Sequence, residues 1–86
     1  MSLPDIVMYA NQSCPYCERA RQVLRRRKLP FTEIDVVAEP GMRAEMMARS
    51  GRRTVPQIFI GDTHVGGSDE LCELDADGRL DALLGD

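Results

Sequence analysis

The amino-acid sequence predicts an α/β domain in which a four-stranded mixed sheet is flanked by helices. Three observations carry this prediction. Short apolar stretches with strand character alternate with longer segments that have helix start and stop signals. Two of the apolar stretches are separated by a Gly-Asp pair, which is typical of a β-hairpin. The chain has 86 residues, the length of one small domain, so we expect residues 1–86 to form a single domain.

The first half of the chain predicts a βαβ unit. Residues 6–9 are continuously apolar, which indicates a strand buried in a sheet. A helix is expected from Pro15, whose missing N–H has no partner in the first helical position, to about Lys28, because Pro30 stops it. Residues 31–37 indicate a second strand with alternate side chains on opposite faces. A helical crossover between two strands makes them parallel.

The second half predicts a helix, a β-hairpin and two shorter helices. Pro40 opens the helix and Gly51 ends it. After the hairpin, Ser68 or Asp69 is expected to cap the next helix. The expected elements are a helix over 40–50, strands over 56–60 and 63–65 joined by a tight turn at 61–62, a helix to about residue 74, and a final helix over 80–84.

Composition excludes several classes of function. A net charge of -3 and a pI near 5.1 argue against a general nucleic-acid binder, which is normally basic. The apolar runs are too short for a membrane-spanning helix. The first ten residues lack a basic region and contain Asp5, so they are not a secretory signal, and we expect a cytoplasmic protein. Three cysteines do not make a disulfide framework.

Cys14 and Cys17 form a CxxC motif at the start of the first predicted helix. Such a motif beside a βαβ unit is typical of thioredoxin-like redox centres. Cys14 is expected at the helix N-cap, where unpaired N–H groups and the helix dipole stabilise a thiolate, so Cys14 is the predicted nucleophile. Cys17 lies one turn further along, on the face that packs on the sheet, and is expected to be buried and protonated. Pro15 stiffens the turn, and Tyr16 partly shields it.

A zinc site is the main alternative for the CxxC motif, because CxxC is also half of a zinc knuckle. A structural zinc site needs four ligands, and the other candidates are His64 and Cys72. Neither lies at a standard ligand spacing, so no metal is expected. His64 is predicted to be a solvated or half-packed hairpin residue, and Cys72 a semi-buried residue without a role in the reaction. Cys72 is a glutathionylation site only if it is exposed.

The sequence resembles the small dithiol glutaredoxins of bacteria. The motifs that carry the resemblance are CPYC at 14–17, TVPQIFI at 54–60 and GGSDEL at 66–71, in the family's order and spacing. The resemblance implies a thioredoxin fold and a glutathione-dependent thiol–disulfide oxidoreductase that works in electron transport and cell redox homeostasis. It also implies that Cys14 and Cys17 form the redox disulfide.

The resemblance further implies where glutathione binds. Pro56 would follow a cis peptide bond, and Val55 would pair in strand fashion with the cysteinyl unit of glutathione. Gly67, Ser68 and Asp69 would hold the γ-glutamyl end, through backbone N–H groups and the Asp69 carboxylate. The remaining residues implied at this site are Tyr16, Thr54 and Arg43.

Two positions depart from the family's pattern. Glutaredoxins commonly carry a lysine where this chain has Asn11, and many have a cysteine where it has Ser68. Without the lysine, another cation is expected to hold the glycine carboxylate of glutathione. The candidates are Arg43, Arg52 and Arg53.

The resemblance also suggests partners and two rival functions. Glutathione is the expected co-substrate, and glutathionylated or disulfide-bonded proteins are the expected substrates, with ribonucleotide reductase a candidate. We expect a monomer that binds neither nucleic acid nor membrane. One rival is a thioredoxin-like electron donor reduced by a flavoenzyme. The other is a binding module in which Cys14 of two chains and two glutathiones hold a [2Fe–2S] cluster, although Pro15 and Tyr16 argue against it.

Two charged segments and one methionine cluster complete the predictions. Basic residues over 21–28 are expected to be a solvated end of the first helix. Residues 69–86 hold seven of the fourteen acidic residues, so the charge is polarised along the chain. Met42, Met46 and Met47 are expected to form one packing face of the second long helix.

Overall fold

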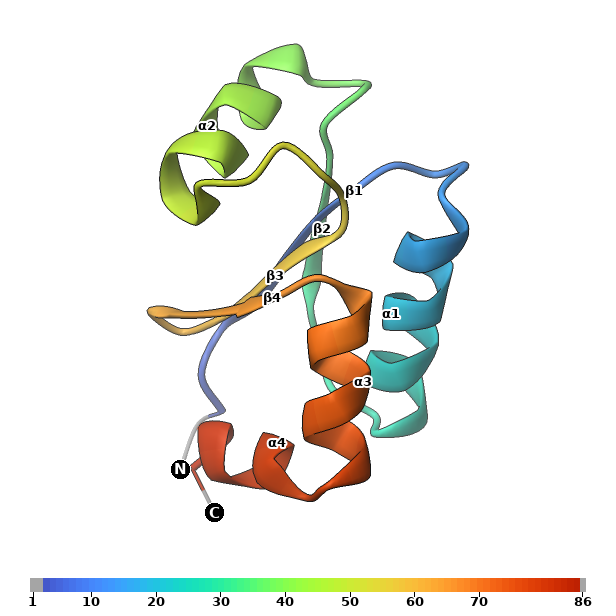
Figure 1. The fold of residues 1–86 in the computed structure, drawn as a ribbon, viewed down its shortest axis with the longest axis vertical. Coiled ribbons are helices and arrows are strands. Elements are labelled where there is room, and N and C mark those ends of the chain that lie inside the picture. Colours follow the sequence, from blue (N-terminus) through green and yellow to red (C-terminus); the bar gives the residue numbers. More distant parts are fainter. Residues whose placement is uncertain (1–2, 86) are drawn as a thin grey trace.

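A computed structural model of the chain describes residues 3–85. It contains four strands and four helices over these residues, in the predicted order, and Figure 1 shows the sheet between two helical layers. The elements are β1 (Ile6–Ala10), α1 (Pro15–Arg26), β2 (Thr32–Asp35), α2 (Pro40–Ser50), β3 (Gln57–Ile60), β4 (Thr63–Gly66), α3 (Ser68–Ala76) and α4 (Arg79–Leu83).

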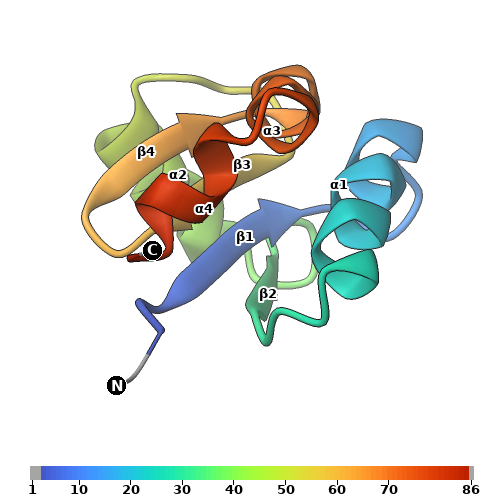
Figure 2. The same cartoon turned by 90° about the horizontal axis from the view of Figure 1, so that it is seen from below.

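The sheet is mixed, with the strand order β2-β1-β3-β4 (Figure 2). The crossover through α1 makes β1 and β2 parallel, as predicted, whereas β3 is antiparallel to both β1 and β4. Gly61 has a φ of 58° in the tight turn between β3 and β4, a backbone conformation that glycine adopts at little cost. The hairpin is therefore confirmed, and the sheet has the predicted four-stranded mixed form.

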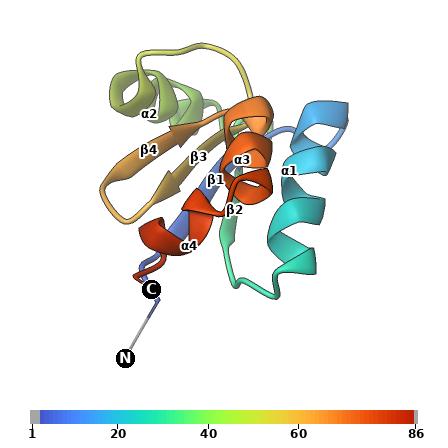
Figure 3. The same cartoon turned by 60° about the horizontal axis from the view of Figure 1, so that its bottom comes forward.

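Side chains alternate across the sheet and build a core on each face. Ile6, Met8 and Ala10 of β1 face the layer of α1, α3 and α4, together with Ile58 and Ile60 of β3. Figures 1 and 3 show α1 and α3 side by side in this layer, and α4 next to the start of β1. The predicted sheet-facing surface of α1 is confirmed, because Cys17, Ala20 and Leu24 are all fully buried there.

The opposite face of the sheet is covered by α2 alone (Figure 1). Tyr9 and Phe59 pack here with Met46, which is fully buried, and Met42 and Met47 are partly buried against them. The three methionines therefore form one packing face, as predicted. The helix runs over the predicted residues and ends at Gly51, whose φ of 72° provides the left-handed C-cap.

Two elements are shorter than the sequence predicts. The first helix ends at Arg26 because Lys28 takes a positive φ of 57° and the backbone closes a Schellman motif, with Lys28 N–H bonded to Arg25 O and Leu29 N–H to Leu24 O. The second strand stops at Asp35, because the Asp35 carboxylate accepts hydrogen bonds from the N–H groups of Val37 and Ala38. These bonds turn the chain.

The remaining boundaries differ by one or two residues. Pro56 lies outside β3 because it has no N–H to donate to the ladder, and β4 extends to Gly66. The third helix continues past Leu74 to Ala76, and the last helix covers Arg79–Leu83 instead of residues 80–84.

Candidate redox site

Cys14 lies at the N-cap of α1, directly after the short loop that follows β1. The loop is closed by two hydrogen bonds to Asn11, from the Ser13 N–H to Oδ1 at 3.0 Å and from the Cys14 N–H to the carbonyl oxygen at 3.3 Å. Cys14 has extended backbone angles, and Pro15 takes the first helical position. The predicted placement of Cys14 is therefore found, and the helix begins where the sequence indicated.

The two sulfurs lie in different environments, and their acidities differ accordingly. Burial would raise the pKa of the Cys14 thiol, but hydrogen bonds from the Cys17 N–H and thiol and from the Tyr16 N–H outweigh it, so this pKa lies below its ordinary value. Burial, followed by the hydrogen bond and charge of Cys14, raises the pKa of Cys17 to about 11, against a backbone hydrogen bond from Asn11. Cys17 is fully buried and Cys14 is partly exposed. The arrangement suits a thiolate at Cys14 and a thiol at Cys17.

The loop before β3 brings Val55 next to Cys14. The Val55–Pro56 peptide bond is cis, as the resemblance implies. The Cys14 Sγ lies 3.9 Å from the Val55 carbonyl oxygen. This contact links the CxxC motif to a segment about forty positions later in the chain.

A cleft of about 320 Å³ is lined by Val55, the residue that contacts Cys14, although Cys14 itself is not part of the lining. It brings together the helix start at Tyr16, the loop before β3 and the start of α3. Besides Tyr16, six other predicted site residues line the cleft. Glu70 also lines it, and the sequence analysis did not predict this residue. The full lining is Tyr16, Arg52, Thr54, Val55, Pro56, Gly67, Ser68, Asp69 and Glu70.

The start of α3 differs from the prediction, because Gly67 is the N-cap instead of Ser68 or Asp69. Ser68 is buried, with 4% of its surface exposed, and makes no side-chain capping bond. The Glu70 carboxylate accepts the Gly67 N–H at 2.6 Å and pairs with Arg52 at 3.0 Å, and these contacts lower the pKa of Glu70. The signal for Glu70 was the acidic residue three positions after an N-cap, which is half of a capping box.

Asp69 points outward from the start of α3. Its side chain is 75% exposed and lies 3.5 Å from the Arg19 guanidinium, which also donates to the Cys72 Sγ at 3.7 Å. Asp69 therefore has an accessible carboxylate at the edge of the cleft. Cys72 is partly buried against the core, as predicted.

The three candidate cations occupy different positions. Arg52 lines the cleft, whereas the Arg43 guanidinium donates to the Arg53 carbonyl at 3.0 Å from the side of α2. Neither Arg43 nor Arg53 is among the residues that line the cleft. Of the three candidates, only Arg52 lines the cleft, where it pairs with Glu70 at 3.0 Å.

The prediction of a solvated basic helix end is wrong for Arg21. Its side chain is 8% exposed and pairs with Glu33 of β2 through two hydrogen bonds, of 2.6 and 2.7 Å. It also contacts Glu18 at 3.0 Å and donates to the Asn11 carbonyl at 3.2 Å. The signals in the sequence were Glu18, three positions before Arg21, and Glu33 in the second predicted strand. The prediction also fails at Arg27, which is partly buried and pairs with Asp75 at 2.9 Å and Asp81 at 3.0 Å, whereas Arg25 and Arg26 are exposed, as predicted.

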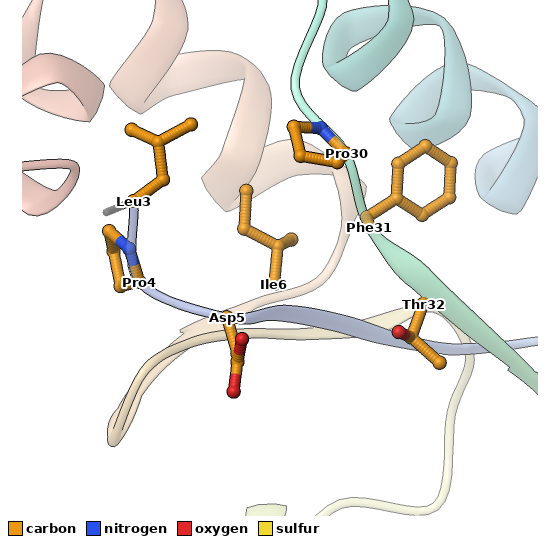
Figure 4. Close-up of a pocket in the computed structure, with 7 residues that line it drawn as sticks. All are labelled: Leu3, Pro4, Asp5, Ile6, Pro30, Phe31 and Thr32. Carbon is orange, nitrogen blue, oxygen red and sulfur yellow. The ribbon is translucent and has the colours of Figure 1, made fainter. Parts of the chain in front are cut away.

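A second cleft, of about 370 Å³, lies at the opposite end of β1 (Figure 4). Its one titratable side chain is Asp5, and no cysteine or histidine borders it. It is lined by Leu3, Pro4, Asp5, Ile6, Pro30, Phe31 and Thr32.

Residues 3–85 contain neither a membrane-spanning helix nor a metal-binding cluster. No helix in this part of the chain is long and apolar enough to cross a membrane. The same residues contain no group of three or more His, Cys, Asp or Glu side chains that could hold a metal ion.

Comparison with known proteins identifies the family. The family profile described as glutaredoxin matches residues 6–65, which include the CxxC motif, Val55 and the hairpin. The chain belongs to the glutaredoxin family. A glutaredoxin from Pseudomonas aeruginosa is 50% identical over 82 residues, which are 95% of this chain and 98% of the relative. Glutaredoxin 3 from Escherichia coli is 45% identical, over 95% and 99% of the two chains.

Solved glutaredoxin structures confirm the thioredoxin fold. The solution structure of glutaredoxin from Brucella melitensis has a TM-score of 0.84 and 52% identity, and the match covers 98% of this chain and 91% of that one. The buckwheat glutaredoxin–glutathione complex has a TM-score of 0.84 at 30% identity, over 95% and 76% of the two chains. Glutaredoxins are glutathione-dependent thiol–disulfide oxidoreductases as a family, and this is the general activity of the present glutaredoxin.

Proposed function

We propose that this glutaredoxin reduces glutathione mixed disulfides and protein disulfides through Cys14 and Cys17, with glutathione as the electron donor. The observation that carries the proposal is the position of Cys14, which is partly exposed at a helix N-cap and in contact with Val55, a residue that lines the cleft. A thiolate is the attacking species in disulfide exchange, and the lowered pKa of Cys14 favours it.

The first step is an exchange at sulfur. The Cys14 thiolate attacks the glutathionyl sulfur of a mixed disulfide, the substrate thiolate leaves and takes a proton from solvent, and a Cys14–glutathione disulfide remains. A second glutathione thiolate then attacks the glutathionyl sulfur, which releases glutathione disulfide and restores the Cys14 thiolate. In the dithiol route, Cys17 loses its proton and attacks the Cys14 sulfur instead, and glutathione leaves as its thiol.

A preference for glutathione would follow from the residues that line the cleft. Thr54, Val55 and Pro56 would offer backbone groups to the cysteinyl unit, and Tyr16 would cover it from the opposite side. At the other end, the N–H groups at the start of α3 would hold the α-carboxylate, and the exposed Asp69 would take the α-ammonium. The buckwheat relative, whose structure is a complex with glutathione, supports glutathione as the ligand.

The proposal also covers partners and location. Glutathionylated and disulfide-bonded proteins are the proposed substrates, with ribonucleotide reductase a candidate among them, and the protein would work as a cytoplasmic monomer. Three cysteines, two of them in the CxxC motif, suit a compartment in which thiols stay reduced.

The test is glutathione-driven reduction of a glutathionylated peptide, coupled to glutathione reductase. We expect turnover in the wild type and in Cys17→Ser, loss in Cys14→Ser, and no change in the control Cys72→Ser. Loss in Cys17→Ser alone would mean that the dithiol route is obligatory. If the wild type shows no turnover with glutathione, the proposal is wrong, and reduction by a flavoenzyme becomes the function to test.

A further inference from the structure

Gln57, the first residue of β3, has its side-chain amide completely buried. The amide nitrogen donates to the Thr54 carbonyl oxygen at 3.0 Å and to the Thr54 hydroxyl at 3.2 Å. Leaving a buried amide group unpaired is unfavourable, so these two bonds fix the position of Thr54 relative to the strand. They also fix the orientation of the amide, because a carbonyl oxygen accepts only from the nitrogen end.

His64 of β4 binds the other end of the same amide. Its Nε2 lies 2.7 Å from the Gln57 Oε1, and an amide oxygen can only accept, so Nε2 carries the hydrogen. The ring is also held by stacking on Phe59, with the ring centroids 4.9 Å apart and the planes at 29°. His64 is half-buried, in agreement with the half-packed histidine that the sequence predicted, and these contacts make it a fixed donor.

The chain of contacts ends at the redox site. Thr54 is exposed, lines the cleft and lies outside any strand or helix. The next residue is Val55, whose carbonyl oxygen is 3.9 Å from the Cys14 sulfur. The peptide between Thr54 and Val55 is thus held from the hairpin side by Gln57, and Gln57 is held by His64.

We propose that His64 and Gln57 are positioning residues for substrate: they hold the Thr54–Val55 peptide in the orientation that a glutathionyl group needs in order to pair with it. Neither residue lines the cleft, so their effect on substrate passes through Thr54. This inference rests on the proposed function, which places glutathione against this loop.

The test compares two reactions of Cys14. Iodoacetamide reports the thiolate alone, because it is small and needs no groove, whereas glutathione disulfide must also bind along the loop. His64→Phe keeps an aromatic ring over Phe59 and removes the donor to Gln57. We expect it to slow the reaction with glutathione disulfide about three- to tenfold, the effect of one hydrogen bond, and to leave alkylation by iodoacetamide unchanged.

Two more variants sharpen the comparison. His64→Gln places an amide N–H near the position of Nε2, so it should recover most of the lost rate. Thr63→Val changes an exposed residue of the same strand outside this hydrogen-bond chain and is the matched control, expected to react like the wild type.

The outcomes separate this inference from the function on which it rests. If the wild type does not prefer glutathione disulfide over bis(2-hydroxyethyl) disulfide, both the proposed function and the inference fail. If the wild type has this preference and His64→Phe keeps it in full, only the positioning role is wrong. Equal slowing of the reactions with glutathione disulfide and with iodoacetamide in His64→Phe would also overturn that role, because it would indicate damage to the thiolate or to the fold.

Discussion

Replacing Glu33 by glutamine removes the negative charge that Arg21 binds between α1 and β2. The wild-type pair has two hydrogen bonds, of 2.6 and 2.7 Å, and its side chains are 8% exposed for Arg21 and 26% for Glu33. Arg21 donates both hydrogen bonds to Glu33, and they raise the pKa of Arg21 despite burial. A guanidinium keeps its charge in proteins even without such a partner, so Arg21 stays charged in the variant. Glutamine keeps the shape of the side chain and leaves this cation with less compensation.

The expected cost lies between two limits. Breaking a fully buried pair costs about 3–5 kcal/mol, and an exposed pair contributes about 0–1 kcal/mol. Glu33 is about a quarter exposed, and Glu18 remains 3.0 Å from Arg21, so we expect a loss of about 2 kcal/mol in the free energy of unfolding. For a domain of this size, that loss lowers the Tm by about 8–16 °C.

Urea unfolding measures this loss directly, since the midpoint falls while the slope m stays constant. Arg79→Gln is the matched control. It breaks an ion pair of 2.8 Å whose side chains are 65% and 46% exposed, and it should cost less than about 0.5 kcal/mol. If Glu33→Gln costs no more than this control, burial does not strengthen the Arg21–Glu33 pair and the reasoning is refuted.

Three further predictions follow from the site and the hairpin. Alkylation of Cys14 should follow an apparent pKa below the ordinary thiol value, while Cys17 should ionise only near pH 11. Equal acidities of the two thiols, measured by mass spectrometry after alkylation across pH, would contradict the assignment. Burial lowers the pKa of His64, so the folded state binds this proton more weakly than the unfolded chain. The free energy of unfolding should therefore fall as pH drops below about 6.5. In urea unfolding, His64→Phe should lose less of this free energy between pH 7 and pH 5 than the wild type does. Gly66→Ala should lower the free energy of unfolding by at least about 2 kcal/mol, because Gly66 has a φ of 118° and a Cβ there would collide with the Glu70 carboxylate. In the control Gly41→Ala the Cβ has open space, so this variant should be neutral or stabilising. Similar thermal midpoints for the two variants would contradict this.

The local elements and the nucleophile followed from the sequence because their signals are local. Pro15 starts a helix through its own backbone, so the residue before it, Cys14, had to be the N-cap. Gly51 ends α2 through its own freedom to adopt a positive φ. Alternation of side chains placed opposite faces of β1 in opposite cores, a period of two that any strand imposes. The family motifs gave the cleft residues by resemblance.

What only the tertiary structure decided depends on residues far apart in the chain. In the sequence, Arg21 belongs to a basic segment, and only the packing of α1 on β2 places Glu33 beside it. Gln57 and His64 became a hydrogen-bonded pair only when β3 and β4 paired in the sheet. Arg52, which lines the cleft, contacts Glu70, eighteen positions later. Such contacts form where packing excludes water, because a polar group without a hydrogen-bond partner is unfavourable there. The partner comes from another element of the fold, so the residues around the polar group do not identify it.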